Sequence, residues 1–296
     1  ELDPELQRAE LILFASYIKD KKIADARKVA KSIELKKPDS SLGMNLNAVT
    51  YLVEENKNKA MSLLTDILKK FPADPLTSNN LARIYLQDKE LDKAKKLYQD
   101  VLAKTPDNLN VLNQMALIAS RENDQVKVLE WLQKAVDRNP AQLSPRLTLA
   151  TQLLKLKEGE KAIGILQDAS AEQKLSSVHM LVTAKAKMSI GEYDHAIRVL
   201  KTVVDENPTS ATAHFTLAQA YAFTKNAKNM RNELIETLNI NPAYLSANIA
   251  LARLDLFERN IEAFKSRVST LIKAYPDNPD VIFLNAKITS GDKNYD

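Results

Sequence analysis

Few side chains in this sequence have the types and spacing that catalysis or metal binding requires. The only histidines are His179, His195 and His214, and their spacing does not match a set of metal ligands. There is no cysteine, which excludes disulfides, thiolate ligands and a cysteine nucleophile. The adjacent carboxylates Glu54 and Glu55 stand near lysines in an expected turn, where solvated surface charge is the simpler interpretation. We therefore expect no catalytic residue, no metal site and no cofactor.

The composition favours a folded, helical chain. Of 296 residues, 45% are hydrophobic and 27% are charged, which is unlike a disordered protein. Only five residues are glycine, and the abundant residue types are strong helix formers. The net charge of +4 is too small to indicate a nucleic-acid partner. No apolar run approaches the roughly 18–20 residues that span a bilayer.

The sequence repeats itself with a fixed period. Prolines recur at the interval that separates Pro38 from Pro72, except for one gap of twice that size whose midpoint is Lys174. Leu-Ala-Arg occurs at Leu81 and again at Leu251, and these two copies are separated by five such intervals. An alanine series keeps the same phase throughout. The prolines are Pro38, Pro72, Pro106, Pro140, Pro208, Pro242 and Pro276, and the alanines are Ala48, Ala82, Ala116, Ala150, Ala184, Ala218, Ala252 and Ala286.

This period, about 34 residues, and these residue types resemble the tetratricopeptide repeat family. The repeat that starts at Pro75 carries the pattern as Leu81-Ala82, Tyr85, Ala94, Tyr98 and Pro106. The resemblance implies an all-α, right-handed solenoid of tandem 34-residue helical hairpins, forming a single array over residues 1–296. Numbered so that the proline falls at position 32, the expected repeats are 7–40, 41–74, 75–108, 109–142, 143–176, 177–210, 211–244 and 245–278, with a partial repeat at 279–296.

Each recurring position has a packing reason. Alanine at position 8, and usually at 20, lets the two helices of a hairpin approach closely, while larger apolar side chains fill the seam between repeats. Proline at position 32 suits the junction between one hairpin and the next, because it cannot continue a helix interior. In the last repeat we expect a first helix over 279–290, followed by a turn that places Tyr295 at position 17. An array cut in mid-repeat predicts that this sequence is a segment of a longer protein.

A binding surface is the function to expect. In this family the first helix of each repeat lines the concave surface, mainly through positions 2, 5, 6, 9, 12 and 13. At these positions the sequence has eight basic residues and one acidic residue, Asp280, although the whole chain is nearly balanced in charge. This bias predicts an anionic partner, and the alternative is an ordinary solvated face. The basic residues are Arg8, Lys19, Arg83, Arg121, Lys155, Lys185, Arg253 and Lys287.

The same positions differ in character along the chain. Amides towards the N-terminal half could hydrogen-bond an extended peptide backbone, and aromatic residues towards the C-terminal half could form apolar anchor pockets. Coverage of the aromatics by further repeats is the alternative. The paired lysine and asparagine of carboxylate-clamp co-chaperones is missing. The amides are Asn45, Asn79, Asn80, Asn113 and Gln114, and the apolar residues are Phe215, Phe223, Ile249, Phe257 and Phe283.

Three stretches resemble one subfamily more closely. They are VLEWLQKAVDRNPAQLSPRLTLA (128–150), SATAHFTLAQAYA (210–222) and YLSANIALARLDL (244–256). They are similar to the tetratricopeptide lipoproteins of the bacterial PEP-CTERM/exosortase system, which accompany exopolysaccharide genes. That resemblance implies a periplasmic, outer-membrane-anchored scaffold, whose lipidated cysteine and signal sequence would lie upstream of this segment.

We therefore expect a non-enzymatic scaffold in protein sorting or polysaccharide export. Its partner would be an acidic protein or peptide, or an anionic polysaccharide, and not a nucleic acid. Membrane contact would come only through the lipid anchor outside this segment. Two alternatives stay open: a cytoplasmic adaptor or co-chaperone that binds an acidic segment, and a substrate-recruiting array of an enzyme whose catalytic domain lies elsewhere.

Overall fold

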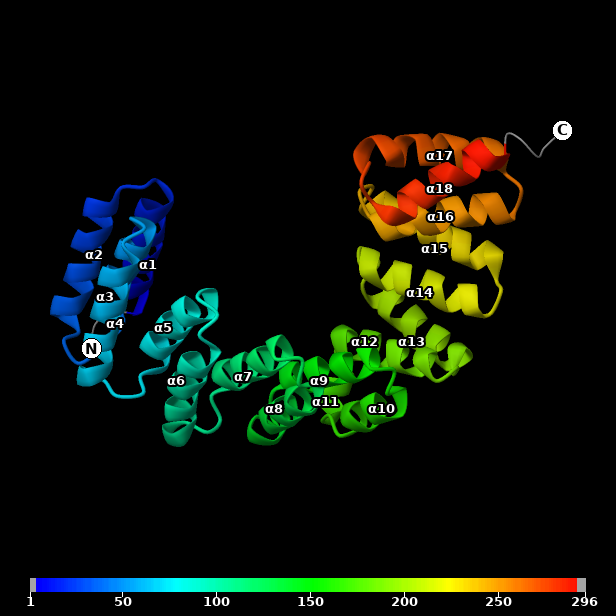
Figure 1. Ribbon diagram of the computed structural model, residues 1–296. Helices are drawn as coiled ribbons and strands as arrows, with labels where there is room; N and C mark the ends of the chain where they lie inside the picture. Colours follow the sequence, from blue (N-terminus) through cyan, green and yellow to red (C-terminus); the bar gives the residue numbers. More distant parts are fainter. Residues whose placement is uncertain (1–3, 292–296) are drawn as a thin grey trace. The chain divides into compact units, whose positions relative to one another are not determined.

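The computed structural model describes residues 4–291, which form eighteen helices and no strand (Figure 1). The chain divides into two compact units between Pro140 and Ala141. The first unit contains α1 (Pro4–Lys19), α2 (Ile23–Lys36), α3 (Leu42–Val53), α4 (Lys57–Lys70), α5 (Pro75–Gln87), α6 (Leu91–Lys104), α7 (Leu109–Arg121) and α8 (Gln125–Arg138). These helices pair into four successive hairpins.

The second unit has four further hairpins and a final helix. It contains α9 (Leu143–Lys155), α10 (Gly159–Gln167), α11 (Ala171–Lys174), α12 (Ser177–Ser189), α13 (Tyr193–Glu206), α14 (Ala211–Phe223), α15 (Ala227–Ile240), α16 (Leu245–Phe257), α17 (Ile261–Ala274) and α18 (Pro279–Gly291). The turn predicted after α18, with Tyr295, lies outside the described residues. That residues 1–296 form a single array stays a prediction. Within residues 4–291 no helix combines the length and the apolar character needed to cross a membrane.

The turn inside each hairpin has one recurring geometry. At position 15 the backbone is left-handed, as at Asn123 with φ 58°. The Asn123 amide donates to the Ser120 carbonyl, and the Asp124 amide donates to the Ala119 carbonyl, which is the Schellman pattern that ends a helix. Asp124 then caps α8, because its side chain accepts from the Lys127 amide. The left-handed residues are Lys21, Glu55, Lys89, Asn123, Lys157, Gly191, Lys225 and Arg259.

The prolines fix the junction between hairpins. A proline disfavours the helical region for the residue before it, because its ring clashes with that residue. Thr105, which precedes Pro106, accordingly has φ −130° and ψ 78° and ends α6. In every complete repeat except 143–176, the repeat period is thus maintained by two chain breaks: a left-handed residue inside the hairpin and a proline after it.

The core is a series of seams between neighbouring helices. Ala82 on α5 and Ala94 on α6 are fully buried where the two helices meet, as their small side chains allow. Tyr98 is also fully buried and packs with Val111 and Ile118 of the next hairpin. Trp131 is half-buried against the same cluster, as its place beside Leu132 suggests. Within each unit, a hairpin therefore uses its successor to complete its core, as expected of stacked repeats.

One repeat departs from the pattern, and it is the one without the proline. In residues 143–176 the second helix, α10, ends early at Gln167, and the short helix α11 follows. The last carbonyls of α10 accept from side chains of neighbouring helices: Arg146 donates to Ile165 at 2.9 Å, and His179 donates to Leu166 at 3.0 Å. Ser170 then caps α11. Side chains here take the place of the proline in ending the helix.

Candidate functional site

All eight predicted basic residues are exposed and lie on first helices of the hairpins or on α18. Four belong to each unit. We call the side chains at positions 2, 5, 6, 9, 12 and 13 the first-helix surface. Among the described residues, Arg83, Lys155 and Lys185 form no ion pair, so their charges face solvent. Exposed, unpaired cations on first helices are what an anion-binding surface requires.

Three of the other basic residues have partners within the protein. The Arg253 guanidinium donates to the Asp280 carboxylate at 2.6 Å, and both side chains are more than half exposed. An Arg121 guanidinium nitrogen lies 3.4 Å from the Leu86 carbonyl oxygen, at the end of α5. The Lys287 ammonium lies 5.3 Å from the centre of the Phe283 ring. Arg253 is thus held by the one acidic residue that the sequence places on this surface.

The amides of the first unit are partly used in internal contacts. Asn45 is buried, donates to Thr77 at 2.8 Å, and accepts from Asn80 at 2.9 Å. It joins α3 to α5, and its amide is therefore not available to a peptide. Asn79 accepts from the Tyr98 hydroxyl at 3.1 Å. Asn113 and Gln114 are half-buried on α7, and the Asn113 amide oxygen has no hydrogen-bond partner among the described residues.

Tyr98 gives the first unit a measurable pH dependence. Burial raises the pKa of its hydroxyl to about 12, against a smaller opposing effect of Arg83 and Arg121. Because the folded state holds the proton more tightly, this group leaves stability unchanged below about pH 10. Between about pH 10 and 12 it should lower the free energy of unfolding by up to about 2–3 kcal/mol.

Denaturant unfolding at a series of pH values from 9 to 12 tests this expectation for Tyr98. A Tyr98→Phe variant cannot lose a proton, so its stability should fall less steeply over this interval. It shares all other tyrosines and lysines with the parent, which makes it the control for their titration. Parallel curves for the two proteins would contradict the raised pKa.

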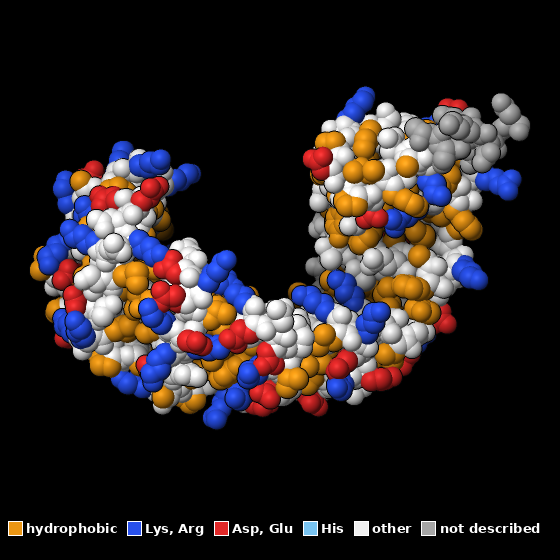
Figure 2. Space-filling view, in the orientation of Figure 1, with side chains coloured by type: hydrophobic (Ala, Val, Ile, Leu, Met, Phe, Trp, Pro, Cys, Tyr) orange, Lys and Arg blue, Asp and Glu red, His pale blue; other side chains and the backbone are white. Residues whose placement is uncertain are grey.

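The second unit contains a pocket of about 890 Å³ between α14, α15 and α16. Figure 2 shows hydrophobic side chains gathered over these helices. Six of its lining residues stand at positions 2, 5, 9 or 13 of three repeats, and the structure brings them together; the sequence analysis named five of them as binding residues and Asp280 as the acidic exception. They are Phe215, Phe223, Ile249, Arg253, Phe257 and Asp280. Ile249 is buried rather than exposed, because it also packs in the core beneath the pocket.

Two aromatic contacts hold the pocket rings in place. Phe223 stacks on Tyr193 with ring centres 4.8 Å apart and an angle of 5° between the planes. Phe215 packs against Tyr244 at 5.0 Å. Phe223 nevertheless remains 56% exposed and Phe257 80% exposed. Large apolar side chains left in water beside a hollow are typical of a binding site.

Sequence reasoning missed the contribution of the second helix to this pocket. Met230 and Leu234 of α15, with Ala227 and Lys225 before them, complete its lining. The signal that could have found them is the repeat period, which also predicts which α15 side chains face α14. Conversely, Lys155, Lys185, Lys287 and Phe283 do not line the pocket.

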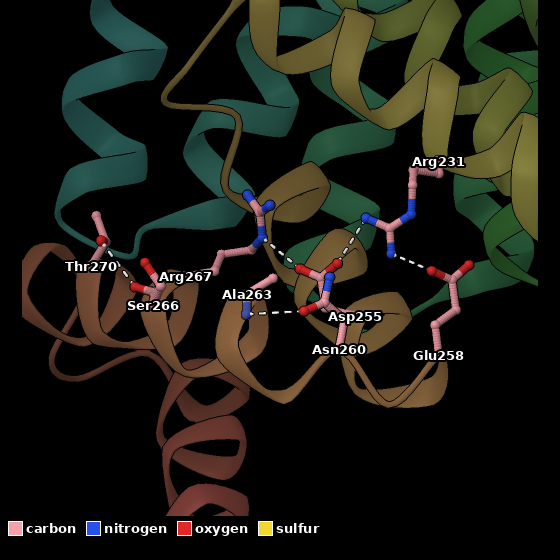
Figure 3. A network of polar contacts seen from close by, with 8 residues as sticks. All are labelled: Arg231, Asp255, Glu258, Asn260, Ala263, Ser266, Arg267 and Thr270. Atoms are coloured by element: carbon pink, nitrogen blue, oxygen red, sulfur yellow. Dashed lines mark hydrogen bonds and ion pairs between the residues drawn. The ribbon is translucent and has the colours of Figure 1, made fainter.

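An ion network centred on the buried Asp255 lies close to the pocket (Figure 3). Asp255 is fully buried, and its two oxygens lie 2.7 Å from an Arg231 nitrogen and 3.2 Å from Arg267. Arg231 also contacts Glu258 at 2.6 Å. Burial works against the charged form of Arg231, but its hydrogen bonds to Asp255 and Glu258 outweigh this effect and raise its pKa. The network links α15, α16 and α17. Its central residue, Asp255, comes directly after Leu254, which lines the pocket.

Two histidines serve as packing residues. His179 is buried against the end of α10, as described above, and His214 is buried between two acceptors. The His214 ring lies 2.7 Å from a Glu233 oxygen and 3.1 Å from the Pro208 carbonyl. Within residues 4–291 no three of the His, Cys, Asp and Glu side chains are grouped so as to hold a metal ion.

Comparison with known proteins supports the architecture. Residues 54–118 and 181–228 each match a sequence model of the tetratricopeptide repeat. No curated protein matches the sequence. Among solved structures, a tetratricopeptide repeat protein from Parabacteroides merdae ATCC 43184 is similar with a TM-score of 0.61 and 15% identity, over 81% of this chain and 95% of that one.

Two other solved structures give the same result. PilW, a widely conserved type IV pilus biogenesis factor, has a TM-score of 0.58 and 15% identity, over 70% of this chain and 96% of that one. The Cut9–Hcn1 hetero-tetramer of the APC/C has a TM-score of 0.56 and 16% identity, over 88% of this chain and 52% of that one. At these identities the likeness establishes the fold alone. The predicted fold class, an all-helical solenoid of tetratricopeptide hairpins, is confirmed.

Proposed function

We propose that the protein is a non-enzymatic scaffold that binds an acidic segment of a partner protein on its first-helix surface. Tetratricopeptide solenoids are scaffolds for protein–protein interaction, and stacked repeats give them extended binding surfaces. The acidic partner is supported by the excess of basic over acidic side chains at the first-helix positions, where eight basic residues stand against Asp280 alone.

The observation that carries this proposal is that two exposed lysines of the first-helix surface have no carboxylate partner among the described residues. Several lysines on second helices and turns have carboxylate partners: Lys127 lies 2.7 Å from Asp124, and Lys161 lies 2.7 Å from Glu158. Lys155 on α9 and Lys185 on α12 are exposed and form no ion pair among the described residues. Since α9 and α12 pack together, both charges are available to one ligand.

A double variant of the second unit tests the proposal. Lys155→Ala with Lys185→Ala should weaken binding of a labelled, end-blocked hexaglutamate peptide by roughly 2- to 30-fold, from about 0.2–1 kcal/mol per exposed ion pair. The binding of the parent protein should itself decrease as salt is added. Fluorescence anisotropy at low and high salt measures both effects.

The matched control removes the same charge from a second helix. Arg198 and Lys201 are exposed on α13, so Arg198→Ala with Lys201→Ala changes net charge equally without altering the first-helix surface. Equal weakening by the two double variants would reduce the effect to net charge and refute the proposed surface. Alginate serves as the second probe: binding of alginate without the peptide would assign the surface to an anionic polysaccharide.

The cellular role that we propose is sorting or export associated with exopolysaccharide, in a lipid-anchored periplasmic protein. This role is supported by the resemblance of the stretches 128–150, 210–222 and 244–256 to the lipoproteins of the exosortase system. The gene sequence upstream of the first codon of this segment tests it. A signal peptide with a lipidation cysteine would support export. An upstream sequence without an export signal would favour a cytoplasmic adaptor or co-chaperone.

A further inference from the structure

We infer that the pocket between α14, α15 and α16 takes one large apolar side chain of the partner segment, and that a neighbouring carboxylate of that segment replaces Asp280 on Arg253. This inference rests on the proposed function and adds the residue types that the partner must have. An acidic segment alone would not suffice: it needs an aromatic or large aliphatic residue next to an acidic one.

The apolar part of the inference follows from the size and lining of the pocket. Its volume of about 890 Å³ lies within the range of small-molecule sites and exceeds what one side chain needs. The hollow exists because small side chains line it: Ala218 and Ala222 of α14 and Ala250 of α16. Further apolar lining comes from Met230 and Leu234 of α15. A phenylalanine side chain that enters such a hollow transfers a large apolar surface out of water.

One of the two exposed rings beside the hollow is held in place before any ligand binds. Phe223 is fixed by its stacking on Tyr193, so little side-chain freedom remains to be lost there on binding. Phe257 is the most exposed large apolar residue of the described chain, at 80%. A ligand that covers both rings would gain affinity without rearranging the helices.

The charges around the pocket indicate the second half of the ligand. Arg253 and Lys225 both line it, against the single carboxylate of Asp280. Lys225 forms no ion pair among the described residues, so the surroundings carry one uncompensated positive charge. A ligand carboxylate beside the apolar side chain would neutralise that charge, whereas a lysine there would be repelled.

Asp280 already occupies the place of such a carboxylate. Its oxygen lies 2.6 Å from the Arg253 guanidinium, but the side chains of the two residues are 59% and 55% exposed. Ion pairs this exposed contribute little and exchange readily. Asp280 is thus an internal competitor for Arg253, and removing its charge should strengthen binding of an acidic ligand.

The experiment uses three end-blocked, labelled peptides: Glu-Glu-Phe-Glu-Glu, Glu-Glu-Ser-Glu-Glu and Gln-Gln-Phe-Gln-Gln. The parent protein should bind the first most tightly, because only the first has both the ring and the carboxylates. Phe257→Ala should weaken the first peptide roughly five- to thirtyfold, as truncated anchor residues do. Asp280→Asn should tighten the binding of the first peptide several-fold. It should leave the binding of the third peptide unchanged, since that peptide has no carboxylate to pair with Arg253.

Leu175→Ala is the matched control for the loss of a highly exposed, large apolar side chain. Leu175 is 76% exposed at the end of α11, does not line the pocket and lies outside the first-helix surface, so this variant should bind as the parent does. Circular dichroism of every variant checks that the helices are intact.

The outcomes separate this inference from the proposed function. In one outcome, the Lys155→Ala/Lys185→Ala variant no longer binds the acidic peptides, while Phe257→Ala and Asp280→Asn bind them as the parent does. The pocket inference is then wrong, and the proposed basic surface stands. If the serine peptide binds as tightly as the phenylalanine peptide, the apolar anchor is likewise refuted. If the first peptide does not bind the parent at low salt, both proposals fall.

Discussion

Replacing Asp255 by alanine is expected to lower the free energy of unfolding by about 3–5 kcal/mol, among the largest effects of any single substitution in the second unit. Asp255 is fully buried, and its carboxylate contacts both Arg231 and Arg267. Without it, two guanidinium groups would keep their partly buried positions with no anion between them. Urea unfolding followed by circular dichroism measures the change.

The comparison that gives this result its meaning is Asp280→Ala. Asp280 also pairs with an arginine, but in an exposed position, so its loss should cost less than about 1 kcal/mol. A second comparison replaces the whole network at once, as Asp255→Leu with Arg231→Met and Arg267→Met. Because apolar replacements of a buried ion cluster are often neutral, this triple variant should recover most of the stability that Asp255→Ala loses. Similar small losses from both single substitutions would show that the network contributes no more than a surface pair.

The second large effect is expected from Gly43→Ala in the first unit. A Cβ atom at residue 43 would lie 2.5 Å from the backbone nitrogen of Glu34 and 2.7 Å from its Cα, so α3 and α2 would have to move apart. Overpacking of this kind costs about 1–3 kcal/mol, and the rigid backbone of α2 places it towards the upper end. Thermal and urea unfolding should both report the loss.

Gly164→Ala is the control for Gly43→Ala. Gly164 also lies in a helix, but an added Cβ meets no atom within 4 Å. Alanine should therefore act there only through its better helix propensity and stabilise the protein by about 0.5–1 kcal/mol. A loss of stability in Gly43→Ala with a gain in Gly164→Ala would separate the effect of close helix approach from that of helix propensity. A stabilising Gly43→Ala would mean that α2 and α3 can separate freely.

The hairpins could be predicted from sequence because their signals are local and repeated. Proline at position 32 and alanine at position 8 act on their own neighbours, so reading their period was enough to place the helices. The early end of α10 was not predicted, although Lys174 marked the repeat as unusual. That end depends on Arg146 and His179, which come from other helices and carry no periodic signal.

Part of the pocket lining could be predicted for the same reason, and the role of these residues in binding stays a prediction. The period assigned Phe215, Phe223 and Phe257 to one face, and the structure places all three around one pocket. Where that pocket forms depends on small neighbours such as Ala222 and Ala250, which leave space that larger residues fill elsewhere. The place of the pocket therefore depends on the combined volume of the side chains around it, which the repeat position of each residue does not give. Asp255 was overlooked as well, though it stands at position 11, where Tyr85 and Tyr221 provide aromatic packing in other repeats.

The left-handed residue inside every hairpin has a consequence for how such a chain can change length. Of the eight residues at position 15, only Gly191 is glycine, so the other seven carry a conformational penalty of about 1–2 kcal/mol each. The penalty comes once in every repeat, as do the seams that offset it. Strain and packing therefore both grow in proportion to the number of hairpins. Insertion or deletion of a whole repeat leaves their ratio unchanged, and evolution can lengthen or shorten the array without redesigning any single turn.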